Sequence, residues 1–181
     1  LSLSLEFLSR LNNLGYEDMN LSINLSVIQL LDKNFFNKVI KIMNERGSIA
    51  NNINLEITEA IFSSDYEYLN SLLSNLKKIG VKLSIDDFGT GYSSLSRERD
   101  LNVDYLKIDK SFIDKLMYLK DEEAITGDII SMAHKMGHLV IAEGVENEKQ
   151  RKYLEENNCD KIQGYLISKP LDDDKAIEFL E

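Results

Sequence analysis

Six short runs of the chain have the character of β-strands, and in the first four apolar and polar residues alternate with a two-residue period. These runs span residues 21–25, 53–57, 82–86, 104–109, 138–143 and, more weakly, 161–165. Before, between and after them lie stretches with apolar residues at helical spacing, at residues 1–14, 27–47, 66–80, 122–137, 147–158 and 172–181. The first period is typical of β-strands and the second of amphipathic helices. Repeated strand–helix units predict an α/β fold with a parallel sheet covered by helices.

The first four predicted strands each have one apolar face and one polar face. The polar faces carry Ser22, Asn24, Asn54, Glu56, Thr58, Lys82, Ser84, Asp86, Tyr105, Lys107 and Asp109. An ordinary parallel sheet is apolar on both faces. A (β/α)8 barrel instead turns one face inward, towards the end that carries active sites. The pattern is compatible with an open doubly wound sheet and with a barrel, although six strands and 181 residues are few for a barrel.

Two adjacent carboxylates, Asp86 and Asp87, end the third predicted strand in the segment KLSIDDFGTGYSSL, and the next turn contains Gly89 and Gly91. Buried acidic groups are costly unless they are paired or bind a cation. A packed polar network is the alternative, but these two acids together with Glu56 carry too much like charge and favour a cation. Carboxylate and amide oxygens predict a hard cation such as Mg²⁺ or Mn²⁺.

Composition narrows the class of protein. The net charge of -10 excludes a general binder of DNA or RNA, which would need a basic face. The one cysteine, Cys159, allows no internal disulfide and fits a reducing compartment. Zn²⁺ is disfavoured because the only histidines, His134 and His138, lie on a helix end and in the loop after it, where they are expected to be surface or capping residues. No apolar run approaches the roughly 20 residues of a membrane span, so we expect a cytoplasmic protein or the cytoplasmic domain of a larger, membrane-bound one.

Six motifs follow one another along most of the chain. They are LSINLS (21–26), LEITE (55–59), IDDFGTGYSSL (85–95), LKIDKSFI (106–113), IAEGVE (141–146) and QGYLISKPL (163–171). In this order they resemble the EAL-domain family of cyclic di-GMP phosphodiesterases. The resemblance implies a (β/α)8, TIM-barrel-like fold with one reversed strand. Residues 1–181 are then expected to be a partial EAL domain with about six of the eight strands, lacking the first two and the Glu-Ala-Leu segment.

The resemblance also implies roles for individual residues. Lys107 and Glu143 match catalytic positions, with Lys107 acting on the attacking water, and Asp86 matches the ligand shared by two Mg²⁺ or Mn²⁺ ions. The implied metal ligands are Asn24, Glu56, Asp86, Asp87 and Glu143. The implied supporting residues are Glu59, which anchors the loop with Gly89, Thr90 and Gly91, and also Glu146 and Gln163, which shape the substrate and metal site.

The implied activity of the parent protein is two-metal hydrolysis of cyclic di-GMP to linear pGpG, whereas residues 1–181 by themselves, without the Glu-Ala-Leu glutamate, are expected to be weakly active or inactive. The alternative is a catalytically inactive receptor of cyclic di-GMP or a regulatory EAL-like domain. An unrelated barrel enzyme of metabolism is disfavoured because no phosphate-cradling glycine-rich motif follows a late strand. We also expect self-association through the apolar faces with Ile23, Leu25 and Ile162, and regulatory domains upstream are compatible with the resemblance.

Overall fold

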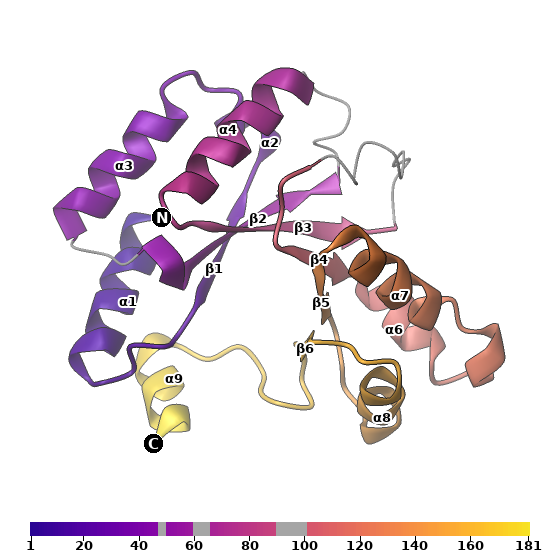
Figure 1. The fold of residues 1–181 in the computed structure, drawn as a ribbon. Helices are drawn as coiled ribbons and strands as arrows, with labels where there is room; N and C mark the ends of the chain where they lie inside the picture. Colours follow the sequence, from indigo (N-terminus) through magenta and orange to yellow (C-terminus); the bar gives the residue numbers. More distant parts are fainter. Residues whose placement is uncertain (47–49, 60–65, 90–100) are drawn as a thin grey trace. The chain divides into compact units, whose positions relative to one another are not determined.

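The structure is a computed structural model that describes residues 1–46, 50–59, 66–89 and 101–181 (Figure 1). Six strands in this part of the chain form one sheet, whose order follows the order of the sequence. They are β1 (Leu21–Leu25), β2 (Ile53–Thr58), β3 (Lys82–Phe88), β4 (Tyr105–Ile108), β5 (Leu139–Ala142) and β6 (Lys161–Ile162). The β1–β2, β4–β5 and β5–β6 pairs are parallel, as the predicted strand–helix repeats require.

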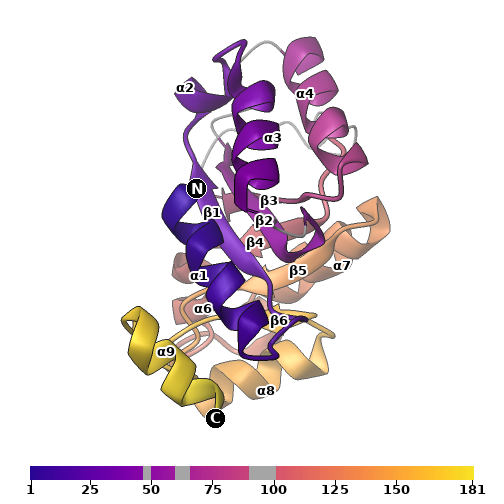
Figure 2. The same cartoon turned by 90° about the vertical axis from the view of Figure 1, so that its left-hand side faces the viewer.

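Helices connect the strands. They are α1 (Ser2–Asn13), α2 (Val27–Leu30), α3 (Phe35–Arg46), α4 (Tyr66–Lys78), α6 (Lys110–Lys115), α7 (Thr126–Met136), α8 (Glu148–Glu156) and α9 (Asp173–Leu180), with short 3-10 turns η1 (Ala50–Asn52) and η3 (Asp121–Glu123). Helix α1 packs against α3 and β1 (Figure 2). Helix α7 packs against β4 and β5. None of the described helices is long and apolar enough to cross a membrane.

Contacts between the residues of the chain divide the protein into two compact units. Unit 1 comprises Leu1–Ser84 with Leu171–Glu181, and unit 2 comprises Ile85–Pro170, so strand β3 contributes to both. In unit 1, Leu5 of α1 and Leu55 of β2 are buried. In unit 2, β4 and β5 share a core with α6, α7 and α8, built around Ile108, Ile113 and Val140. The expectation that residues 1–181 form one partial domain stays a prediction.

The predicted polar face of the sheet is present in unit 1. The Asn54 side chain, 4% exposed, donates hydrogen bonds to the Ser22 and Ser84 hydroxyls, at 2.9 and 3.0 Å. These residues come from β2, β1 and β3, so one layer of polar side chains crosses three strands. These three side chains form a packed polar network, which is the arrangement that the sequence offered as the alternative to a bound cation. The acidic positions Glu56 and Asp86 lie two residues further along their strands.

The stretch 27–47, predicted as one helix, is instead two helices, α2 and α3. Helix α2 begins at the Ser26 cap, whose hydroxyl accepts a hydrogen bond from the Gln29 N–H. The Asp32 carboxylate accepts hydrogen bonds from the Asn34 N–H and from the Lys38 ammonium. An aspartate that bonds the nearby backbone competes with helical hydrogen bonding, and the chain turns there before α3.

The structure differs from the sequence-based expectation at three further places. Helix α6 was not predicted, although Asp109 caps it by accepting a hydrogen bond from the Ser111 N–H at 3.0 Å. His138 is buried, not at the surface, and its Nδ1 lies 3.2 Å from the Val103 carbonyl oxygen. The last strand, expected over residues 161–165, has only two residues.

Candidate active site

A buried lysine joins two carboxylates at the centre of unit 2. Lys107 of β4 is 2% exposed, and its Nζ lies 3.1 Å from Asp86 Oδ1 and 2.7 Å from Glu143 Oε1. A buried ammonium is costly unless anions and hydrogen bonds compensate the lost hydration. The predicted catalytic lysine and two predicted metal ligands therefore form one ionic cluster.

The register of the sheet explains why Lys107 and Glu143 meet. Lys107 lies opposite Ile141 in the parallel β4–β5 pair. Residues two apart on a strand share a face, and Glu143 follows Ile141 by two residues. The Glu143 N–H donates to the Ile108 carbonyl oxygen at 3.1 Å, which continues the ladder one step beyond β5 and holds Glu143 on the face of Lys107.

The backbone of β3 is irregular at the second of the two adjacent aspartates, Asp87. Neighbours on an ordinary strand point to opposite faces, but Asp87 has a left-handed backbone with φ 55°, which is uncommon for a residue other than glycine. Its N–H donates to Asp86 Oδ1 at 3.0 Å. The sequence assigned this freedom to Gly89 and Gly91. Gly89 is left-handed, with φ 92°, but the irregular backbone begins earlier, at Asp87.

The loop itself was also a predicted part of the site. Gly89 is its last described residue, and a Cβ there would lie 2.7 Å from the ring of Phe112. Close packing therefore demands glycine here in addition to the backbone angle. The predicted loop residues Thr90 and Gly91 lie outside the described part of the chain.

Three carboxylates of unit 2 fit a divalent cation. Asp86, Asp87 and Glu143 each offer one oxygen, and these oxygens lie within 4.8 Å of one another. An all-oxygen, anionic set of donors is the kind that Mg²⁺ and Mn²⁺ prefer. Lys107, in contact with two of the three, partly compensates their like charge. The cluster is thus chemically suited to hold a hard cation beside an ammonium.

The other two predicted ligands lie in unit 1. Asn24 of β1 and Glu56 of β2 are direct register partners in the parallel pair. Glu56 is buried and Asn24 is exposed. Glu59, the predicted anchor of the loop after β3, is buried just beyond the end of β2. The metal-binding roles of Asn24 and Glu56 and the anchoring role of Glu59 stay predictions.

Glu146 lies in the loop that follows β5, and Gln163 is hydrogen-bonded to that loop. The Glu146 carboxylate accepts a hydrogen bond from the Lys110 ammonium at 2.9 Å. Gln163 is exposed, and its carbonyl oxygen accepts from the Val145 N–H at 3.0 Å. Hydrogen bonds to Asp114 and to Glu146 raise the pKa of Lys110. Both residues therefore contribute to the framework of the loop, and their predicted roles towards a substrate stay predictions.

Gln150 was missed by the sequence analysis. It follows Asn147 by three residues, the spacing of a helix-capping pair, and this spacing was the only local signal for it. The Gln150 side chain is almost completely buried and accepts hydrogen bonds from the N–H groups of Glu146 and Asn147. Its bond to another helix depends on the tertiary fold, which no local pattern reveals.

Comparison with known proteins decides the family. A profile of the EAL domain matches residues 1–170. The chain belongs to the EAL domain family. It is 39% identical over 166 residues to the cyclic di-GMP phosphodiesterase NbdA of Pseudomonas aeruginosa. The matched region covers 92% of this chain and 21% of NbdA. The chain thus spans about a fifth of the length of the first curated relatives that it matches.

Solved EAL structures have the same fold. The EAL domain of Mycobacterium smegmatis DcpA matches with a TM-score of 0.93 and 37% identity, over 99% of this chain and 81% of that domain. The PaMucR phosphodiesterase in complex with c-di-GMP matches with a TM-score of 0.90 and 31% identity, over 97% of this chain and 71% of that one. The predicted α/β fold of the TIM-barrel-like EAL type is confirmed.

Proposed function

We propose that this EAL domain hydrolyses cyclic di-GMP to linear pGpG with the help of Mg²⁺ or Mn²⁺. The observation that carries the proposal is the contact of Lys107 with both Asp86 and Glu143, with Asp87 completing a set of three carboxylates. The similarity to a named cyclic di-GMP phosphodiesterase and to a phosphodiesterase in complex with c-di-GMP supports the choice of substrate.

The residue types fit the chemistry of a phosphodiester. Its negative charge repels nucleophiles, and bound divalent cations supply charge neutralisation and a water of lowered pKa. Asp86, Asp87 and Glu143 would hold such an ion. Lys107, fixed between two carboxylates, orients or activates the attacking water. A lysine held by ion pairs on a strand is well placed for this role because a pre-positioned group loses little entropy in the reaction.

The arrangement with two ions belongs to the same proposal. Asp86 would be the residue that serves both ions, and Asp87 and Glu143 would help to hold the second. Asn24 and Glu56 are further ligands, while Glu59, Glu146 and Gln163 support the site. A cytoplasmic location and regulatory domains upstream also stay predictions from the sequence.

Self-association through the strand faces is less favoured than the sequence indicated. Leu25 is buried within unit 1, and Ile162 is partly buried against the core of unit 2. Neither residue offers a large apolar surface to a second copy of the chain. The prediction of self-association therefore rests on Ile23 and on surfaces that the sequence did not single out.

Product analysis tests the proposed function. The protein that carries this domain is incubated with cyclic di-GMP and Mn²⁺, and the nucleotides are separated by chromatography, with an EDTA-treated sample in parallel. We expect linear pGpG to accumulate with Mn²⁺ and not after chelation. Binding of cyclic di-GMP without hydrolysis would replace the proposal by the receptor function, and absence of binding would contradict both.

A further inference from the structure

The loop between β5 and α8, residues 143–147, carries Glu143 and is tied on one side to the segment that follows β6. The Val145 N–H donates to the Gln163 carbonyl oxygen at 3.0 Å, and the Val145 carbonyl accepts from the Leu166 N–H at 2.9 Å. Val145 is fully buried in the core of unit 2. One side of the loop is therefore fixed by the backbone and by packing.

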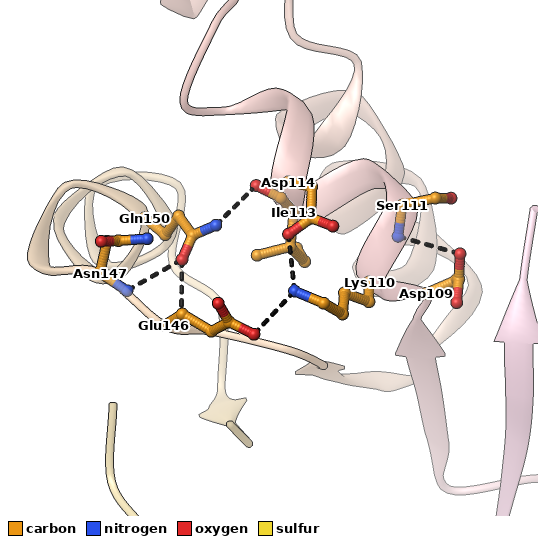
Figure 3. Close-up of polar contacts among 8 residues, drawn as sticks. All are labelled: Asp109, Lys110, Ser111, Ile113, Asp114, Glu146, Asn147 and Gln150. Atoms are coloured by element: carbon orange, nitrogen blue, oxygen red, sulfur yellow. Dashed lines mark hydrogen bonds and ion pairs between the residues drawn. The ribbon is translucent and has the colours of Figure 1, made fainter. Parts of the chain in front are cut away.

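The other side of the loop is tied to α6 by the side chain of Gln150 (Figure 3). Its Oε1 accepts from the N–H groups of Glu146 and Asn147, at 2.8 and 3.0 Å. Its Nε2 donates to the carbonyl oxygen of Ile113 in α6 at 3.1 Å. Gln150 is 1% exposed, so water does not readily replace these hydrogen bonds.

Helix α6 belongs to the same segment of chain as Lys107. Strand β4 ends at Ile108, and Asp109 caps the helix that begins at Lys110. Gln150 therefore connects the loop that carries Glu143 to the helix that directly continues the strand of Lys107. The distance between the lysine and the carboxylate depends on how these two segments are held.

A second tie, formed by Lys110, runs parallel to the first. The Lys110 ammonium lies 2.9 Å from Glu146 and 2.8 Å from Asp114 (Figure 3). The lysine crosses directly over Gly144, where a Cβ would lie 2.4 Å from Lys110 Cγ. Lys110 is about half exposed, so solvent weakens this tie, and the buried contacts of Gln150 are the stronger constraint.

We propose that Gln150 is a positioning residue of the active site, which holds Glu143 in place beside Lys107 and Asp86. Capping α8 needs only an acceptor for the Asn147 N–H. The capping role explains neither the complete burial of the Gln150 amide nor its hydrogen bond to Ile113. This inference rests on the proposed function, because it treats Glu143 as a metal ligand. Groups that orient ligands indirectly alter metal affinity by roughly 10- to 100-fold.

Two variants on the same helix separate positioning from stability. Gln150→Met keeps the length of the side chain but loses all three hydrogen bonds. Tyr153→Phe loses the phenol bonds to the Gly127 N–H and the Ala124 carbonyl oxygen, neither of which belongs to the loop. Titration of the chain with Mn²⁺ by calorimetry, alongside thermal unfolding, compares them. We expect both variants to lower the Tm, but only Gln150→Met to weaken Mn²⁺ binding, by about tenfold or more.

Gln150→Glu keeps an oxygen for the two N–H groups of the loop, and it decides the matter if Gln150→Met does not fold. We expect its Mn²⁺ affinity to lie closer to that of the unaltered chain than to that of Gln150→Met, or to remain measurable if Gln150→Met is unfolded. The proposal would be overturned if a folded Gln150→Met bound Mn²⁺ as tightly as the unaltered chain, or if Tyr153→Phe lost as much affinity. Loss of Mn²⁺ binding in Gln150→Glu would also overturn it, as would absence of Mn²⁺ binding by the unaltered chain. Mn²⁺ binding without hydrolysis of cyclic di-GMP would overturn the proposed function and leave the comparison of Gln150 variants valid.

Discussion

The Nζ of Lys107 lies 2.7 Å from Glu143 Oε1, although 36 positions of sequence separate strand β4 from the loop after β5. The contact places a candidate catalytic cation against a candidate metal ligand. A change in either residue therefore acts on both parts of the site. For this reason variants of the cluster are best tested by metal binding and by turnover separately.

Asp86→Asn should weaken Mn²⁺ binding by about tenfold or more. Asp86 contributes to the three-carboxylate cluster and contacts Lys107, and an amide oxygen is neutral and so a weaker ligand for a hard cation. Calorimetric titration with Mn²⁺ measures the change. Asp128→Asn, an exposed position in the first turn of α7, removes the same charge away from the cluster. Equal affinities of the two variants would exclude Asp86 as a ligand.

Gly89→Ala should destabilise the protein more than Gly137→Ala does. Both glycines are left-handed, with φ 92° and 89°, so both substitutions carry a backbone cost of about 1 kcal/mol. Only at Gly89 would the new Cβ collide with the Phe112 ring, which should add about 1–3 kcal/mol. Urea unfolding gives both values. Equal losses of stability would show that the ring moves aside without cost.

Asp160 should make the protein more stable near neutral pH than in acid. Burial alone would raise the pKa of this carboxyl, but hydrogen bonds from His134 and from the Val140 N–H hold it below its usual value. A folded-state pKa below the unfolded value means that the stabilisation is present above the unfolded pKa of about 3.9 and is lost as pH falls through the folded pKa.

Asp160→Asn tests this pH dependence. Urea unfolding at pH 6 should show a loss of about 1 kcal/mol relative to the unaltered chain, a small value because both side chains of the pair are partly exposed. The difference between the two proteins should shrink at pH 3. A difference that stays constant from pH 6 to pH 3 would mean that the ionised carboxylate contributes nothing.

The sequence predicted the regular parts of this fold because they follow from periodicity. Ser22, Asn54 and Ser84 could be placed on one face from the two-residue period alone, and the structure joins them by hydrogen bonds. The break between α2 and α3 was missed because it depends on what the Asp32 side chain bonds. Helix periodicity records apolar spacing and is insensitive to such local competition.

The candidate site was predictable in its residue types but not in its geometry. The motifs identified Asp86, Asp87, Lys107 and Glu143, and the structure brings these four together. The left-handed backbone of Asp87 was not foreseen because no local pattern of the sequence distinguishes it from the regular strand around it. The bond from Gln150 to α6 was missed for a similar reason, since it exists only when α6 and α8 pack together.

The turnover of a Lys107 variant tests the central claim most directly. Lys107→Ala is compared with the unaltered chain for kcat and for cyclic di-GMP affinity in Mn²⁺. The control is Lys120→Ala, which alters an exposed lysine that lies near Glu122. The account predicts that Lys107→Ala lowers kcat by about 100-fold or more while affinity changes by only a few-fold, because Lys107 acts on the attacking water. Lys120→Ala should match the unaltered chain. An unchanged kcat in Lys107→Ala would contradict the account, and a loss confined to affinity would make Lys107 a phosphate-binding residue instead.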